Sequence, residues 1–157
     1  MKLISILFLL AFPASAAAPA AEMRSVAAAQ VNVRSGPGGG YDVVWRAVKF
    51  YPLEVLDREG AWVRVGDYEN EEGWVHGALL SEAPSLVVIS RRANVRSGPG
   101  PDHEVVWEVE KEFPMKVLDA SGSWYHVTDD DGLEGWIHKS VTWGYSANTE
   151  LNAAGAD

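Results

Sequence analysis

The stretch NVRSGPG occurs twice without a change, at 32–38 and at 94–100. Its glycines could cradle a phosphate, but a P-loop also needs a lysine and a following helix whose amides point at the anion. Neither follows the motif here. Proline fixes φ and glycine permits positive φ, so the motif suits a tight reversal of the chain. We interpret it as a structural turn built on Gly36, Pro37, Gly38, Gly98, Pro99 and Gly100.

Each motif carries an arginine and is followed by a ring-bearing residue. Arg34 and Arg96 could brace the loop by hydrogen bonds or face an acidic ligand. We favour bracing, because the planar guanidinium offers five donors in a fixed fork. Tyr41 follows the first turn, and His103 takes its place after the second. Whatever the ring contacts can therefore differ between the two sites.

Trp45 and Trp107 each end a VVW run. If Val44 and Val106 are core residues, the alternation of a strand turns these two tryptophans partly outward. An exposed ring beside the turn would line a groove suited to an extended peptide or a sugar face. The candidate groove residues are Arg34, Tyr41, Trp45, Arg96, His103 and Trp107. Core packing is the expected role of Trp62, Trp74, Trp124 and Trp136.

The chain shows no pattern typical of a catalytic or metal site. It has no cysteine, and its four histidines share no metal-ligand spacing between the two copies. The acidic run DDDGLE at 129–134 lacks the spacing of a calcium loop. There is no Gly-x-Ser-x-Gly motif, and the acids lie in turns without a matched buried pair. We expect a noncatalytic protein that needs no metal or cofactor.

The elements that must position these residues are duplicated. A shift of 62 residues places 32–76 on 94–138 without a gap, and six of the seven tryptophans form three matched pairs. Short alternating runs between turn residues predict β-strands. The runs of the first copy are 30–35, 43–49, 51–57, 61–67 and 73–76. Closing such strands into a small barrel protects the sheet edges, so we predict an all-β fold.

The domain organisation follows from this duplication. We predict a first domain at 24–82 and a second at 86–145, joined by the short stretch SEAPS at 81–85. A linker this short predicts that the two barrels touch. The small and polar tail 146–157 is expected to be disordered.

The first residues have the order of a secretory signal peptide. Lys2 precedes the apolar run Leu3–Phe12, and small residues follow at 14–16. The run is about half of the ~20 residues that a membrane-spanning helix needs. We therefore expect 1–16 to be a cleaved signal peptide and the mature protein to be periplasmic or secreted. Without a cysteine at the cut site it is not expected to be a lipoprotein.

The charge balance disfavours two classes of partner. The chain carries 13 basic and 22 acidic residues, for a net charge of −9. Nucleic acids and anionic membranes both select for basic surfaces. We therefore expect neither a nucleic-acid partner nor electrostatic docking on a membrane.

The complete order of motifs resembles the bacterial SH3 (SH3b) domain, present twice in tandem. The resemblance rests on NVRSGPG followed by Lys49, Pro52, Gly60, Trp62, Gly73 and Trp74, all of which recur in the second copy. It implies two tandem SH3-like β-barrels of about five to seven short strands each. It also implies a noncatalytic binding or targeting role in the cell envelope, with no catalytic residue to assign.

Two functions follow as expectations. The first is recognition of peptidoglycan or its stem peptides through aromatic-lined grooves. The alternative is a protein–protein interaction, as a docking or regulatory subunit of an envelope complex or as an inhibitor of a wall enzyme. Retention on isolated cell wall separates the first function from the alternative.

Overall fold

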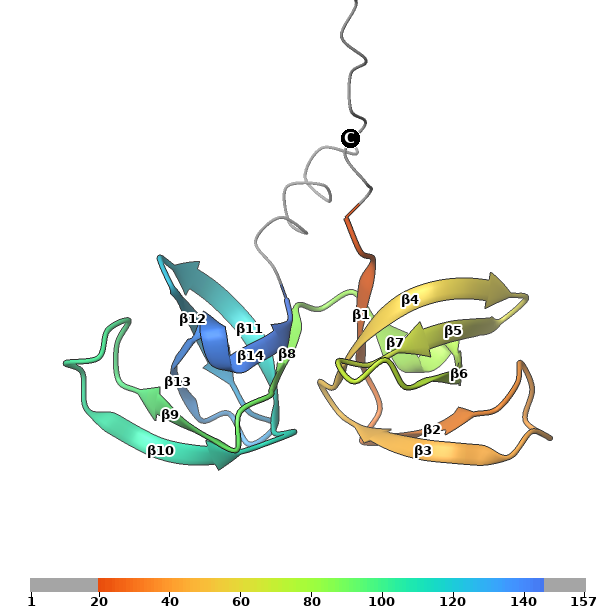
Figure 1. Cartoon of the computed structure of the whole chain (residues 1–157), viewed down its shortest axis with the longest axis horizontal. Coiled ribbons are helices and arrows are strands. Elements are labelled where there is room, and N and C mark those ends of the chain that lie inside the picture. The colour runs from red at the N-terminus through yellow and green to blue at the C-terminus, as the bar shows by residue number, and fades with distance from the viewer. Residues whose placement is uncertain (1–19, 146–157) are drawn as a thin grey trace, which may run out of the picture.

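The computed structural model describes residues 20–145 and confirms the all-β prediction. The strands form two seven-stranded antiparallel sheets, each curled into a small barrel, and the barrels lie side by side (Figure 1). The predicted signal peptide at 1–16 and the predicted disordered tail at 146–157 lie outside the described residues. No helix within 20–145 is long and apolar enough to cross a membrane.

Barrel 1 contains the five strands predicted from the first copy, with one more strand at each end. Its elements are β1 (Met23–Val26), β2 (Gln30–Arg34), β3 (Val43–Val48), β4 (Pro52–Glu59), β5 (Trp62–Gly66), β6 (Glu72–His76), the 3-10 helix η1 (Gly77–Leu79) and β7 (Leu80–Ser81). Their order in the sheet is β3-β2-β6-β5-β4-β1-β7. The pairing of β2 with β6 is the long-range step that brings the two ends of the repeat together.

Barrel 2 repeats this arrangement. Its elements are β8 (Ser85–Val88), β9 (Arg92–Arg96), β10 (Val105–Glu110), β11 (Pro114–Ser121), β12 (Trp124–Thr128), β13 (Glu134–His138), the 3-10 helix η2 (Lys139–Val141) and β14 (Thr142–Gly144). The sheet order is β10-β9-β13-β12-β11-β8-β14, which matches barrel 1 strand for strand.

Each barrel encloses a core drawn from alternate strand positions. In barrel 1, Val31 and Val33 of β2 face inward with Val63 and Val65 of β5, and Val75 of β6 joins them. Their neighbours along the strands are more exposed, which is the period of two expected for a sheet with one buried face. The second copy builds its core at the matching positions of β9, β12 and β13.

The two barrels also pack against each other. Val87 of β8 is fully buried and belongs to the core cluster of barrel 1, although its strand belongs to barrel 2. Trp143 of β14 packs against the same cluster, and its ring lies 6.4 Å from the ring of Tyr68. Apolar side chains of barrel 2 therefore complete the core of barrel 1.

Two lysines at equivalent positions extend this contact. Lys49 forms an ion pair with Asp130 in the turn between β12 and β13. Lys111 forms the reciprocal pair, with Nζ 2.8 Å from Oε1 of Glu69 in the turn between β5 and β6. The hydrogen bond from Lys111 lowers the pKa of the Glu69 carboxyl. Each barrel thus contributes one lysine and one acidic turn to the interface.

Candidate functional site

The arginines of the repeated motif brace their own loops. Nη1 of Arg34 donates a hydrogen bond to the carbonyl of Tyr41 at 2.8 Å, and Nη1 of Arg96 does the same to His103 at 2.9 Å. The bonds span the whole turn, since donor and acceptor lie seven residues apart in both copies. This is the bracing geometry favoured by the guanidinium fork.

The motif forms a turn in both copies, but its glycines serve a purpose other than the predicted one. Neither Gly36 nor Gly98 has a positive φ, so the turn does not use the left-handed backbone that glycine permits. A Cβ on Gly36 would lie 2.5 Å from the ring of Tyr41, and one on Gly98 would lie 2.5 Å from the ring of His103. Glycine is needed because the ring after the turn folds back onto the backbone.

The predicted outward groove around Trp45 and Trp107 does not form. Both tryptophans are half-buried and pack against the barrel cores, whereas Val44 and Val106 are 51% and 46% exposed. The Trp45 ring meets Tyr51 edge to face at 5.8 Å. Tyr41, by contrast, is 50% exposed.

The alternation of β3 is regular but opposite to the predicted one, because Trp45 and Ala47 face the core while Val44, Arg46 and Val48 are exposed. The register between β2 and β3 pairs Val33 with Trp45 and then Arg34 with Val43, which leaves Val44 unpaired. This register shift is a β-bulge, and beside it Val43 and Val44 are both exposed. The same shift occurs between Val105 and Trp107 in barrel 2.

The tryptophans expected in the core lie instead on the outer faces of the barrels. Trp62 of β5 and Trp74 of β6 alternate with buried valines, are half-buried themselves and point away from the interior. Trp124 and Trp136 do the same in barrel 2. We name these surfaces the outer platforms. They consist of Trp62, Arg64, Trp74 and His76 in barrel 1, and of Trp124, His126, Trp136 and His138 in barrel 2.

The outer platform of barrel 1 combines aromatic rings with arginines. Trp62 lies opposite His76, and their rings meet edge to face at 5.5 Å. Trp74 lies between Arg64 on β5 and Arg34 on β2 in the strand register. Arg64 also forms an ion pair with Glu72. Through Arg34 the platform is continuous with the braced turn, so two predicted site residues, Arg34 and Tyr41, border it.

The outer platform of barrel 2 has the same aromatic residues as that of barrel 1, but His126 stands in place of Arg64. Trp124 and His138 meet edge to face at 5.1 Å. His126 replaces the arginine and stacks on Trp136, with centroids 4.8 Å apart and an angle of 15° between the planes. Its Nε2 lies 3.2 Å from Oε2 of Glu134. The two platforms therefore share one plan and differ in the group beside the central tryptophan.

The platforms present aromatic rings at the protein surface. A half-buried tryptophan is held in place and still presents part of its ring, which suits the apolar faces of sugars and peptides. The matched histidines are used structurally, because Nδ1 of His76 accepts the N–H of Ala78 and Nδ1 of His138 accepts that of Ser140. Within residues 20–145 no three His, Cys, Asp or Glu side chains gather as a metal site.

Comparison with known proteins identifies the family that this barrel pair defines. Models of the bacterial SH3 domain match residues 29–81 and residues 90–144, one for each barrel. The chain belongs to the bacterial SH3 family, and the predicted resemblance is confirmed.

Among curated proteins, the chain is 28% identical over 150 residues to the putative N-acetylmuramoyl-L-alanine amidase YrvJ of Bacillus subtilis. The match covers 87% of this chain and 29% of that protein. This chain is also 32% identical over 60 residues to the probable cell wall amidase LytH of Staphylococcus epidermidis. That match covers 38% of this chain and 21% of LytH. The chain therefore spans less than a third of the length of these relatives.

Among solved structures, NlpC1 from Trichomonas vaginalis resembles this chain at 18% identity with a TM-score of 0.36. The match covers 90% of this chain and 51% of that protein.

Proposed function

We propose that this chain is a noncatalytic, extracytoplasmic module that binds the bacterial cell wall, recognising peptidoglycan or its stem peptides through the two outer platforms. The observation that carries the proposal is the repetition of partly exposed tryptophans on the outer face of both barrels. Large apolar rings on a surface cost free energy unless they meet a partner, so such surfaces mark interaction sites.

The composition of the platforms fits a wall polymer. Tryptophan faces stack on the apolar faces of sugar rings, and arginine recognises carboxylates such as those of stem peptides. In barrel 1, Arg34 and Arg64 stand on either side of Trp74 in the strand register. The chain as a whole is acidic, with a net charge of −9, so the pairing of cations with rings is local to this surface.

The names of the relatives also support a role at the cell wall. YrvJ and LytH are named as a putative muramoyl-alanine amidase and a probable cell wall amidase. The segment they share with this chain contains the bacterial SH3 repeats. A wall-binding role for these repeats accounts for the similarity without assigning the amidase reaction to this chain.

The test is cosedimentation of the full chain with purified sacculi. We expect the wild type to pellet with the wall and the double variant Trp74→Ala/Trp136→Ala to stay in the supernatant. The matched control is Leu79→Ala/Leu133→Ala, which removes one exposed apolar side chain from each barrel, and neither leucine is a platform residue. The control should pellet like the wild type, and circular dichroism should show that both variants keep the fold.

Two results would contradict the proposal. If the platform variant pelleted with sacculi as well as the wild type does, residues outside the platforms would bind the wall. A wild type that ignores sacculi but crosslinks to an envelope protein would favour the alternative, in which the barrels dock a protein partner.

A further inference from the structure

A second binding surface lies between the two barrels. It is a groove of about 380 Å³ that both barrels line. Barrel 1 and the residues before it contribute Ala21, Met23 and Glu54, and barrel 2 contributes Tyr125, Lys139, Thr142, Trp143, Gly144 and Tyr145. None of these residues belongs to an outer platform, so the groove is a separate feature of the fold.

Strands β14 and β4 touch beside the groove. Gly144 has a φ of +124°, and a Cβ there would lie 2.7 Å from Cβ of Pro52. Only glycine allows this contact. Glu54 follows two residues after Pro52 on β4, and Trp143 directly precedes Gly144 on β14. A packed contact between two strands therefore adjoins the groove residues Glu54 and Trp143.

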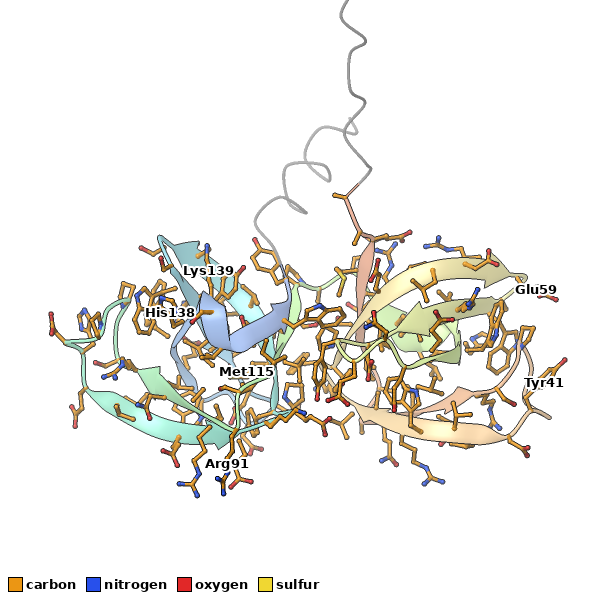
Figure 2. All side chains as sticks on the ribbon, in the orientation of Figure 1. Tyr41, Glu59, Arg91, Met115, His138 and Lys139 are labelled. Atoms are coloured by element: carbon orange, nitrogen blue, oxygen red, sulfur yellow. The ribbon has the colours of Figure 1, made fainter. Side chains whose placement is uncertain are left out.

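Aromatic side chains form the wall on the side of barrel 2. Tyr125 is 5% exposed, and its hydroxyl donates to the carbonyl of Tyr145 at 3.0 Å. The two tyrosine rings meet edge to face at 5.2 Å. Lys139 places Nζ 4.8 Å from the centre of the Tyr125 ring, on the upper side of barrel 2 in Figure 2. The wall is thus apolar and fixed, with an ammonium group held over it.

The two charges that line the groove have opposite signs and come from opposite barrels. Within the described part of the chain, neither Glu54 nor Lys139 has an ion-pair partner. By contrast, Lys49 and Lys111 both do. A carboxylate and an ammonium group that face one groove unpaired match a ligand with the reverse charges.

We propose that the groove binds a short peptide that carries a free amino group and a free carboxylate. The amino group pairs with Glu54, the carboxylate pairs with Lys139, and the apolar part of the peptide lies on Trp143. The volume is at the lower end of the range for ligand sites, about 300–1,000 Å³, which suits a few residues rather than a long chain. A neutral sugar would leave both charges without a partner.

The experiment is a titration of the full chain with trialanine, followed by heteronuclear NMR. We expect saturable shifts at the indole N–H of Trp143 and at the amides of Thr142 and Gly144. Glu54→Gln and Lys139→Gln should each weaken binding about tenfold, as expected for the loss of one charge-assisted hydrogen bond. Glu59→Gln and Arg91→Gln are the matched controls. Both residues are exposed, and Figure 2 shows Glu59 at the far end of barrel 1 and Arg91 on the side of barrel 2 opposite Lys139.

Peptides with one blocked terminus test which groove residue pairs with which end of the peptide. N-acetyl-trialanine should bind about tenfold more weakly, and Glu54→Gln should then have no further effect on it. Trialanine amide should likewise bind about tenfold more weakly than trialanine, and Lys139→Gln should have no further effect on its binding. The proposal is overturned if trialanine causes no saturable shift in the groove, if blocked and free peptides bind equally, or if the two groove variants bind like the controls.

This inference does not rest on the outer platforms or on the wall as their ligand. Sacculus retention depends on Trp74 and Trp136, whereas the trialanine titration depends on Glu54 and Lys139. Failure of one experiment therefore leaves the other unaffected.

Discussion

In each barrel one tryptophan packs against that barrel's core while two lie on the outer surface, and Trp143 of barrel 2 packs against the core of barrel 1. Trp45 and Trp107 join the cores from the strand that carries the bulge. The tryptophans of the β5–β6 and β12–β13 hairpins face outward. The same residue type therefore supports stability at one position and, under the proposed function, contacts the wall at the others, and mutation separates the two roles.

Replacing Trp45 tests this division. Trp45→Ala should lower the free energy of unfolding by about 2 kcal/mol, roughly half the cost of truncating a fully buried aromatic residue. Trp45→Phe should cost much less, because Nε1 of Trp45 is buried and has no hydrogen-bond partner within the described residues. Urea unfolding of both variants measures the difference. An equal loss in both would show that the indole itself is required.

Ser25 offers a stabilising substitution. The side chain is 1% exposed, and its Oγ has no hydrogen-bond partner among the described residues. Val87 holds the equivalent place in barrel 2, since Ser25 pairs with Pro52 and Val87 pairs with Pro114. Ser25→Ala removes a buried, unpaired hydroxyl and should raise the free energy of unfolding by about 1 kcal/mol. Thermal denaturation gives the sign directly, and a lower melting temperature would contradict this reasoning.

At the scale of elements, the close crossing of β2 and β6 defines each barrel. These strands share one register pair, Arg34 with Trp74, beside which Gly73 lies against β2. A Cβ on Gly73 would stand 2.4 Å from Cγ1 of Val33 and 3.0 Å from the carbonyl oxygen of Arg34. The glycine is needed for backbone contact, and the tryptophan after it is thereby carried onto the platform.

Gly73→Ala should therefore destabilise barrel 1 by about 1–3 kcal/mol, the usual cost of overpacking a closed site. Gly39→Ala is the matched control, because a Cβ there meets nothing within 4 Å. Chemical denaturation should separate the two variants clearly. If both unfold like the wild type, the strands can move apart and the contact does not limit the fold.

Much of this organisation could be predicted from the sequence, and what was missed has a physical reason. The exact repeat and the spacing of turn residues predict two β-barrels. The outward position of Trp62 is not predicted, because a large apolar ring is expected in the core and Val63 beside it is apolar too. The inward position of Trp45 is missed for the same reason, since Val44 and Trp45 are both apolar and alternation alone does not decide which of them faces the core. The contact of Lys49 with Asp130, 81 residues away, is likewise invisible to local patterns.

At the scale of the whole molecule, the interface includes a tyrosine with a perturbed titration. Burial and the hydrogen bond from Tyr68 to Glu112 raise the pKa of Tyr68 to about 12. The ordinary pKa of tyrosine is about 10. Between about pH 10 and pH 12 the hydroxyl of Tyr68 therefore stays protonated in the folded state and is deprotonated in the unfolded state. The resulting stability is fully present below about pH 10 and is lost as pH rises toward 12.

Tyr68→Phe should make the loss of stability above pH 10 shallower. The variant also loses the bond to Glu112, so its free energy of unfolding should be lower than that of the wild type near neutral pH. Urea unfolding at a series of pH values between 8 and 11 separates the two effects. Parallel curves for wild type and variant would show that Tyr68 does not cause the alkaline sensitivity.

The reciprocal lysine contacts have a consequence for symmetry. Lys49 reaches the acidic turn of barrel 2, and Lys111 reaches the acidic turn of barrel 1, so each barrel offers the same patch to the other. An interface in which one surface meets its own copy is isologous, the hallmark of a twofold dimer. The lysine contacts are reciprocal in this way, whereas the apolar contacts of Val87 and Trp143 come from barrel 2 alone. Because one chain carries both halves of the interface, its formation is intramolecular and does not depend on protein concentration.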